Sequence, residues 1–221
     1  MLVQKIKLPN ISAIILAAGK SSRMKTPKPL LKLDKEALIN FQIKSLKNSH
    51  IEEIIVVLGS NAEEIKKEIL SNEVKVVENI DFELGKTTSI KKGLSEINDK
   101  NDILLIAVDQ PRNKLLIEQI SSFHIHHPGD KKIVMPFSNG KSGHPIIFSN
   151  IFFNELTQIN EETEGQDIAN ASKTRVPSNL VIPAPPSFSA TIIPPRPNSP
   201  AFSIREGIKP SSMASILSMF G

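Results

Sequence analysis

A short stretch near the N-terminus combines small side chains with spaced positive charges. Its members, in chain order, are Leu16, Ala17, Ala18, Gly19, Arg23 and Lys28. Small side chains let backbone N–H groups approach phosphate oxygens, and cations neutralise the charge of those oxygens. The stretch contains neither G-x-x-x-x-G-K-[ST] nor G-x-G-x-x-G, the two commonest phosphate-binding patterns. It therefore predicts either a polyphosphate site of another kind or an ordinary charged turn after a strand.

Asp109 is the second residue whose place in the chain indicates chemistry. It follows the most apolar run of the sequence, residues 103–108, and precedes Gln110 and Pro111. A carboxylate at such a place is poorly solvated unless it is paired, hydrogen-bonded or bound to a cation. Beside a triphosphate it would be a ligand of Mg2+, which takes one or two carboxylates together with phosphate oxygens. The alternative is that Asp109 caps the following helix, with Pro111 at its first position.

Two further segments contain residues that could contact a substrate. Gly85 and Ser89 belong to the segment Gly-Lys-Thr-Thr-Ser-Ile, whose hydroxyls and free N–H groups suit a nucleotide or an ordinary helix cap. His144, in Gly-His-Pro, would face an acceptor substrate or simply occupy a turn before a proline. The histidines at 124, 126 and 127 are not accompanied by the carboxylate or cysteine ligands that a metal site needs, so a solvated helix end is expected there.

The elements that must position these residues alternate between strand and helix up to about residue 150. Apolar runs predict strands at 11–16, 54–58, 74–77, 103–108, 133–135 and 145–148, with amphipathic helices between them. Asn61 and Glu64 have the spacing of a capping box at one helix start. The alternation indicates an α/β fold with a mostly parallel sheet covered on both faces. Such sheets bind ligands at the carboxyl ends of their strands, where Gly19 and Asp109 are predicted to lie.

Composition excludes several classes of protein and partner. The 221 residues include no cysteine, which rules out disulfides, thiolate metal sites and a cysteine nucleophile and fits a cytoplasmic protein. No apolar run reaches the ~20 residues of a membrane span, so no membrane partner is expected. The net charge is +4, but residues 166–221 contribute 5 Lys+Arg against 2 Asp+Glu. With no Trp, no Tyr and no basic stripe, nucleic acid is not an expected partner either.

The character of the chain changes after Gly165. Nine of the 16 prolines lie between Pro177 and Pro210, and runs such as Ala-Pro-Pro suit neither a helix interior nor a central strand. We therefore expect a folded domain over residues 1–165 and a Pro/Ser-rich, disordered tail over residues 166–221.

Four motifs occur in the order and spacing of a known family. They are L-A-A-G-K-S-S-R-M with P-K-P-L-L, Gly85 with Ser89, Asp109-Gln110-Pro111, and Gly143-His144-Pro145. Over about residues 11–165 the chain resembles the MobA-like nucleotidyltransferases, and most closely their molybdenum cofactor cytidylyltransferase branch. The resemblance implies a Rossmann-like nucleotide-diphospho-sugar transferase fold. It also implies transfer of NMP from an NTP to a phosphorylated acceptor, with release of pyrophosphate.

The resemblance implies roles for individual residues. The implied nucleotide-binding set is Leu16, Ala17, Ala18, Gly19, Arg23, Lys28, Asn79, Gly85 and Ser89. Arg23, Lys28 and Asp109 would be catalytic, with Asp109 as the ligand of a Mg2+ cofactor, and His144 would bind the acceptor. The Ala-Ala-Gly form of the turn looks like that of cytidylyl-transferring members, so CTP is expected rather than GTP. Molybdopterin is the acceptor that this branch implies.

The sequence departs from the family pattern at two places. Lys25 stands where the family usually has glycine, and no Asp-rich motif that would supply a second carboxylate follows Gly165. The C-terminal part of the family domain is therefore expected to be missing. Three interpretations stay open: a nucleotidyltransferase acting on a phosphorylated pterin, a sugar-phosphate nucleotidyltransferase, and an inactive protein that binds an NTP or a cofactor.

Overall fold

The computed structural model describes residues 10–21, 24–51, 53–127, 133–138, 141–159 and 201–205. The strands are β1 (Ile11–Ala17), β2 (Lys32–Leu33), β3 (Glu36–Ala37), β4 (Glu53–Leu58), β5 (Lys75–Glu78), β6 (Asp102–Ala107), β7 (Ile133–Ser138), β8 (Lys141–Ser142), β9 (Ile146–Phe148) and β10 (Ala201–Arg205). The α-helices are α1 (Leu38–Asn48), α2 (Ala62–Glu68), α3 (Lys86–Leu94), α4 (Lys114–His126) and α5 (Phe153–Gln158), and the 3-10 helices are η1 (Lys28–Leu30), η2 (Phe82–Leu84) and η3 (Asn150–Phe152). In the part of the chain described, no helix has the length and apolarity needed to cross a membrane.

The main sheet is mixed, with a parallel centre. Within the described residues it has eight strands in the order β10-β7-β9-β6-β1-β4-β5, and β8 pairs with β7. β1 lies between β4 and β6 and is parallel to both, and β5 is parallel to β4. β9 is antiparallel to β6 and β7. The predicted α/β fold with a mostly parallel sheet is confirmed, and β1 and β6 end side by side.

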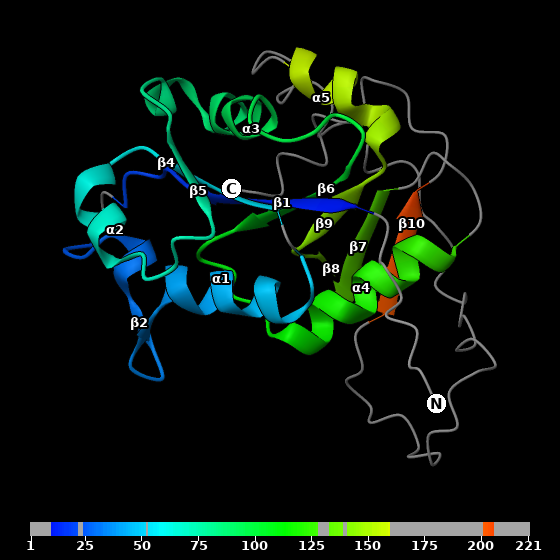
Figure 1. The fold of residues 1–221 in the computed structure, drawn as a ribbon, viewed down its shortest axis with the longest axis horizontal. Coiled ribbons are helices and arrows are strands. Elements are labelled where there is room, and N and C mark those ends of the chain that lie inside the picture. The colour runs from blue at the N-terminus through cyan, green and yellow to red at the C-terminus, as the bar shows by residue number, and fades with distance from the viewer. Residues whose placement is uncertain are drawn as a thin grey trace.

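Helices cover both faces of the sheet, with α3 and α5 on one face and α1 and α4 on the other (Figure 1). β1 supplies both cores by alternation, because Ala13 and Ile15 pack on the α1/α4 side and Ile14 on the α3/α5 side. Burial of both faces explains why this strand reads as a continuous apolar run. Gly93 lets α3 approach β1 closely, since a Cβ there would lie 2.6 Å from Ile14 Cγ2.

One expectation about helix ends is wrong, and a second is wrong at one residue. Asn61 precedes α2 in the left-handed conformation (φ 58°), and its side chain makes no capping hydrogen bond, so the capping box with Glu64 does not form. His124 does not lie at a solvated helix end. It is fully buried, and its Nε2 lies 2.8 Å from Asp102 Oδ2. The apolar face of α4 carries this imidazole into the core, where the carboxylate satisfies it.

One segment of the Pro-rich region belongs to the sheet. β10 pairs antiparallel with β7, with Phe202 opposite Pro136 and Ile204 opposite Val134. At these five residues the structure differs from the expected disordered tail. Apolar and polar residues alternate in Phe-Ser-Ile-Arg of this strand. The high proline content around the strand led to the expectation of disorder. All other residues of 166–221 lie outside the described part of the chain.

Candidate functional site

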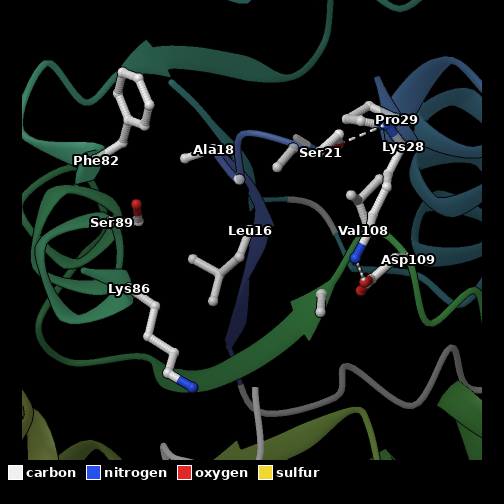
Figure 2. Close-up of a pocket in the computed structure, with 13 residues that line it drawn as sticks. Leu16, Ala18, Ser21, Lys28, Pro29, Phe82, Lys86, Ser89, Val108 and Asp109 are labelled. Carbon is white, nitrogen blue, oxygen red and sulfur yellow. Dashed lines mark hydrogen bonds and ion pairs between the residues drawn. The ribbon is translucent and has the colours of Figure 1, made fainter. Parts of the chain in front are cut away.

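A cavity of about 230 Å³ opens at the carboxyl ends of β1 and β6. It is lined by Leu16, Ala17, Ala18, Gly19, Ser21, Lys28, Pro29, Phe82, Lys86, Ser89, Ala107, Val108 and Asp109. Figure 2 shows Phe82, Ser89 and Lys86 on one side of it, and Ser21, Lys28 and Asp109 on the other. Its place agrees with the rule that open α/β sheets bind ligands at the carboxyl ends of their strands.

The pairing of β1 with β6 brings the two main sequence motifs together. Leu16 is in register with Ala107, and the Val108 N–H donates to the Leu16 carbonyl over 3.1 Å. The small-residue turn and Asp109 therefore leave the sheet as neighbours. Among the described residues, a Cβ built on Gly19 would meet no heavy atom within 4 Å. The space above this glycine is thus open to a ligand that approaches the main chain.

Lys28 is positioned by a local hydrogen bond and reaches Asp109. Its backbone N–H donates to Ser21 Oγ over 3.0 Å, which fixes the start of η1. Its ammonium Nζ lies 2.7 Å from Asp109 Oδ2 (Figure 2). The two side chains are 45% and 38% exposed, so solvent and ligands reach the pair. A phosphate can therefore compete for the lysine and a cation for the carboxylate.

The structure excludes the helix-cap alternative for Asp109. α4 begins at Lys114, and its N-cap is Asn113, whose side chain accepts a hydrogen bond from the Leu116 N–H over 3.0 Å. Asp109 lies four residues before that cap and contributes to the cavity wall instead.

The opposite wall comes from η2 and the first turns of α3. Asn79 is 5% exposed and donates to Ser89 Oγ over 2.9 Å and to Thr88 Oγ1 over 2.8 Å. It does not line the cavity; it holds the hydroxyl that does. Gly85 does not line it either. As N-cap of α3 it has φ 118°, a conformation that favours glycine, and it sets the direction in which the helix starts.

His144 lies outside the cavity lining and is buried, with 1% exposure. Burial lowers the pKa of His144 to about 4, a hydrogen bond with the Leu105 backbone opposes this shift, and the charge of Arg112 adds to it. The imidazole is therefore neutral at neutral pH. Arg112 also contacts this residue directly, because its Nε donates to the His144 carbonyl over 2.8 Å.

Most of the predicted nucleotide set meets at one cavity, with some differences. Residues 16–19, at and just after the end of β1, line it together with Lys28, Ser89 and Asp109. Arg23 lies outside the described residues. The predicted set omits six residues that line the cavity: Ser21, Pro29, Phe82, Lys86, Ala107 and Val108.

The missed residues differ in the signal they left in the sequence. Ser21 belongs to the motif L-A-A-G-K-S-S-R-M, and Lys86 belongs to the segment Gly-Lys-Thr-Thr-Ser-Ile. Sequence reasoning selected both segments but assigned no role to these two residues. Phe82 left no signal in its own segment. The structure shows why the ring fits: Gly59 makes room for it, since a Cβ on this glycine would lie 2.7 Å from Phe82 Cγ.

The donor set at the cavity fits a magnesium ion that is shared with a nucleotide. Mg2+ takes one or two carboxylates and completes its shell with phosphate oxygens and water. Asp109 is the carboxylate that lines the cavity. Across the described ranges, no three His, Cys, Asp or Glu side chains converge as a self-contained metal site. Asp109 would therefore hold such an ion together with a triphosphate, and the ion would neutralise phosphate charge.

Comparisons with known proteins agree with this geometry. Residues 13–176 match the model of the MobA-like NTP transferase domain. The chain is 32% identical over 121 residues to the bifunctional protein GlmU of Clostridioides difficile (strain 630), covering 53% of this chain and 26% of that protein. It is 30% identical over 147 residues to nicotine blue oxidoreductase of Paenarthrobacter nicotinovorans, covering 63% of this chain and 71% of that protein. The chain thus spans about a quarter of the length of the first relative.

The solved structures include Rv0371c from Mycobacterium tuberculosis H37Rv. Its TM-score is 0.61 at 23% identity, and the match covers 69% of this chain and 78% of that chain. A manganese complex of the same protein has a TM-score of 0.55. At this identity the likeness establishes the fold, a Rossmann-like α/β domain. Because the family model matches well over half of the chain, the chain belongs to the MobA-like NTP transferase domain family.

Proposed function

We propose that this protein is a nucleotidyltransferase that moves NMP from an NTP to a phosphorylated acceptor and releases pyrophosphate. One observation supports this most strongly: the open main chain at Gly19 and the Lys28–Asp109 pair face the same cavity. A triphosphate needs amide donors, a cation and a metal ligand close to each other. The main chain at Gly19, Lys28 and Asp109 are the candidates for these three roles. Family membership supports the same activity.

The chemistry requires no nucleophile from the protein. An oxygen of the acceptor phosphate attacks the α-phosphorus of the NTP, a new P–O bond forms, and the bond to the pyrophosphate oxygen breaks. The protein contributes positioning and charge stabilisation. The amides of the 17–19 turn would hold the triphosphate, Lys28 would neutralise its charge, and Arg23 would add a second cation. Mg2+, held by Asp109, would supply further neutralisation of phosphate charge when bound.

For the substrates, we propose CTP as donor and a molybdopterin-type phosphorylated pterin as acceptor. The Ala-Ala-Gly form of the turn supports CTP. Ser89 and Phe82 line the cavity on the side of α3, where the nucleotide would bind. The manganese complex of the Rv0371c structure supports a divalent cation as cofactor.

Pyrophosphate release measures this activity directly. The protein is incubated with Mg2+, molybdopterin and each of CTP, GTP, UTP and ATP in turn. We expect release with CTP to exceed release with the other three, and to require the acceptor. Release with a sugar 1-phosphate and UTP, but not with molybdopterin, would instead identify a sugar-phosphate nucleotidyltransferase.

A second candidate is a protein that binds an NTP or a cofactor without transferring a nucleotide. One observation favours it: the relative that the chain covers to 71% is named an oxidoreductase, not a transferase. Binding of CTP with Mg2+, without pyrophosphate release for any of the acceptors above, would support this candidate over the first.

A further inference from the structure

Arg112 is a half-buried cation in the loop between β6 and α4, three residues after Asp109. Three of its N–H groups donate to the protein: Nε to the His144 carbonyl over 2.8 Å, Nη1 to the Pro111 carbonyl over 3.0 Å, and Nη2 to Gln110 Oε1 over 3.3 Å. All three acceptors are uncharged oxygens. The guanidinium is thus fixed in orientation without being neutralised.

The charge of Arg112 lacks compensation in the described part of the structure. No ion pair there joins it to a carboxylate within 4.0 Å. Burial lowers the pKa of Arg112, yet an arginine stays charged in proteins. A partly desolvated cation with only neutral partners is costly to hold. A guanidinium has five N–H donors, so one N–H remains on each Nη atom, the arrangement that suits a planar or tetrahedral oxyanion.

Arg112 lies three residues after Asp109, which lines the cavity, and bonds to His144 on the side of β6 away from the nucleotide turn. Its charge acts on the buried His144, as do those of Asp109 and Lys86, and the latter two line the cavity. In the sheet, β6 separates β9 from β1. Arg112 Nε donates to the carbonyl of His144, which precedes β9, whereas Gly19 follows β1 on the other side of β6.

Gly143, which precedes β9, lies beside the guanidinium of Arg112. A Cβ on this glycine would lie 3.6 Å from Arg112 Nη2, within ordinary contact. A larger side chain would therefore contact Nη2, which carries one of the two remaining N–H groups. Gly143 presents no side chain to this atom.

We propose that Arg112 binds the phosphate monoester of the acceptor, on the side of Asp109 opposite the nucleotide turn. This inference rests on the proposed nucleotidyl transfer. In that reaction the attacking and leaving oxygens lie on opposite sides of the α-phosphorus. The pyrophosphate side has the 17–19 turn and Lys28, so the attacking phosphate needs a cation of its own, and Arg112 supplies one.

The test uses phenyl phosphate as a monoester probe and α,β-methylene-CTP as a nucleotide that cannot be cleaved. Isothermal titration measures phenyl phosphate binding to the full chain with Mg2+ and saturating α,β-methylene-CTP. We expect Arg112→Gln to weaken phenyl phosphate binding at least ~10-fold, the scale of a lost charge-assisted hydrogen-bond pair. The affinity for α,β-methylene-CTP should stay within ~2-fold of wild type, because a purely acceptor-side group does not contact the nucleotide.

Two further variants sharpen the test. Lys114→Gln removes an exposed cation two residues along the chain, which pairs with Glu118, and should leave both affinities unchanged. Gly143→Val keeps the arginine but covers it, and should weaken phenyl phosphate binding as Arg112→Gln does. If circular dichroism shows that Arg112→Gln does not fold, the affinity of Gly143→Val for phenyl phosphate decides whether Arg112 binds this probe.

The outcomes separate this inference from the proposed function. Equal phenyl phosphate binding in wild type and Arg112→Gln, no binding to wild type at millimolar concentration, or an equal loss in Lys114→Gln would overturn the role of Arg112. Failure of α,β-methylene-CTP to bind the wild type would overturn the proposed function instead. If the nucleotide does not bind, phenyl phosphate is titrated into wild type and Arg112→Gln without it. The difference between these two affinities then decides whether Arg112 binds a phosphate monoester.

Discussion

Lys28 and Asp109, 81 positions apart in the chain, meet with a separation of 2.7 Å between Nζ and Oδ2. Each comes from the loop after a central parallel strand, and the pairing of β1 with β6 makes the contact possible. An ion pair as exposed as this one contributes about 0–1 kcal/mol to stability. The fold therefore gains little from the pair, and the two charges remain available to a ligand at the cavity.

Removal of the carboxylate should separate activity from stability. In Asp109→Ala we expect kcat to fall at least ~100-fold, the scale seen when one preorganised charge-stabilising group is lost. The free energy of unfolding should change by no more than about 1 kcal/mol, because the pair is half-exposed. Pyrophosphate release and urea unfolding measure the two effects. Glu68→Gln removes an acid from another exposed pair, with Lys32, and is the matched control. Turnover at the wild-type rate in Asp109→Ala would remove this residue from the mechanism.

A side chain at Gly19 should block nucleotide binding without disturbing the fold. A Cβ there meets no described atom within 4 Å, so Gly19→Val has room in the ligand-free protein. The added methyls would occupy the space through which phosphate oxygens reach the main chain. We expect an affinity for CTP at least ~10-fold weaker, the cost of about 1.4 kcal/mol of lost contacts, with an unchanged melting temperature. If calorimetry shows normal CTP affinity for this variant, the triphosphate does not bind at the turn.

Gly93 provides the opposite case, in which a methyl group damages packing and spares the site. Its Cβ would lie 2.6 Å from Ile14 Cγ2 and 3.2 Å from Val57 Cγ2, so α3 must shift away from the sheet in Gly93→Ala. Overpacking of this kind costs about 1–3 kcal/mol of unfolding free energy. Urea denaturation measures the loss, and CTP binding well below the unfolding midpoint should be retained. A variant as stable as wild type would show that α3 does not pack as closely as described.

His144 should make stability depend on pH in the acidic range. Because the pKa of His144 is lowered from 6.5 to about 4 in the folded state, only the unfolded chain takes up a proton here as the pH falls below about 6.5. Stability should therefore decrease from pH 6.5 towards pH 4, by about 3 kcal/mol in total for this group. Above pH 6.5 it contributes no pH dependence.

The comparison variant for this effect is His144→Gln. Between pH 7 and pH 5 we expect the wild type to lose about 2 kcal/mol more than this variant, since that interval covers part of the titration. Identical pH dependence in wild type and His144→Gln would contradict the burial of a neutral imidazole.

Strong local patterns explain which parts of the fold were predictable. β1, β4 and β6 are continuous apolar runs because both of their faces are buried. When such strands alternate with helices along the chain, only a few sheet topologies are possible. The rule that ligands bind at strand carboxyl ends then placed Gly19 and Asp109 together. To place these two residues at the same edge of the sheet, only the direction of the strands had to be known, not the packing of side chains.

The unpredicted features depend on where distant segments cross. Phe82 enters the cavity wall because Gly59 makes room for it, and neither segment shows this alone. The burial of His124 depends on Asp102 lying at the start of a neighbouring strand. Asn61 has the residue types of a capping box, but its left-handed backbone directs the side chain elsewhere. The positions of Phe82 and His124 thus depend on tertiary contacts, and that of Asn61 on its backbone conformation.

The most direct test of the whole account is a crystal structure of the protein with CTP and Mg2+. The account predicts triphosphate oxygens within hydrogen-bond distance of the 17–19 amides, with Lys28 on the phosphates and the Asp109 carboxylate turned towards the metal. Nucleotide bound away from the Gly19 turn, or an Asp109 side chain directed away from bound CTP, would contradict it.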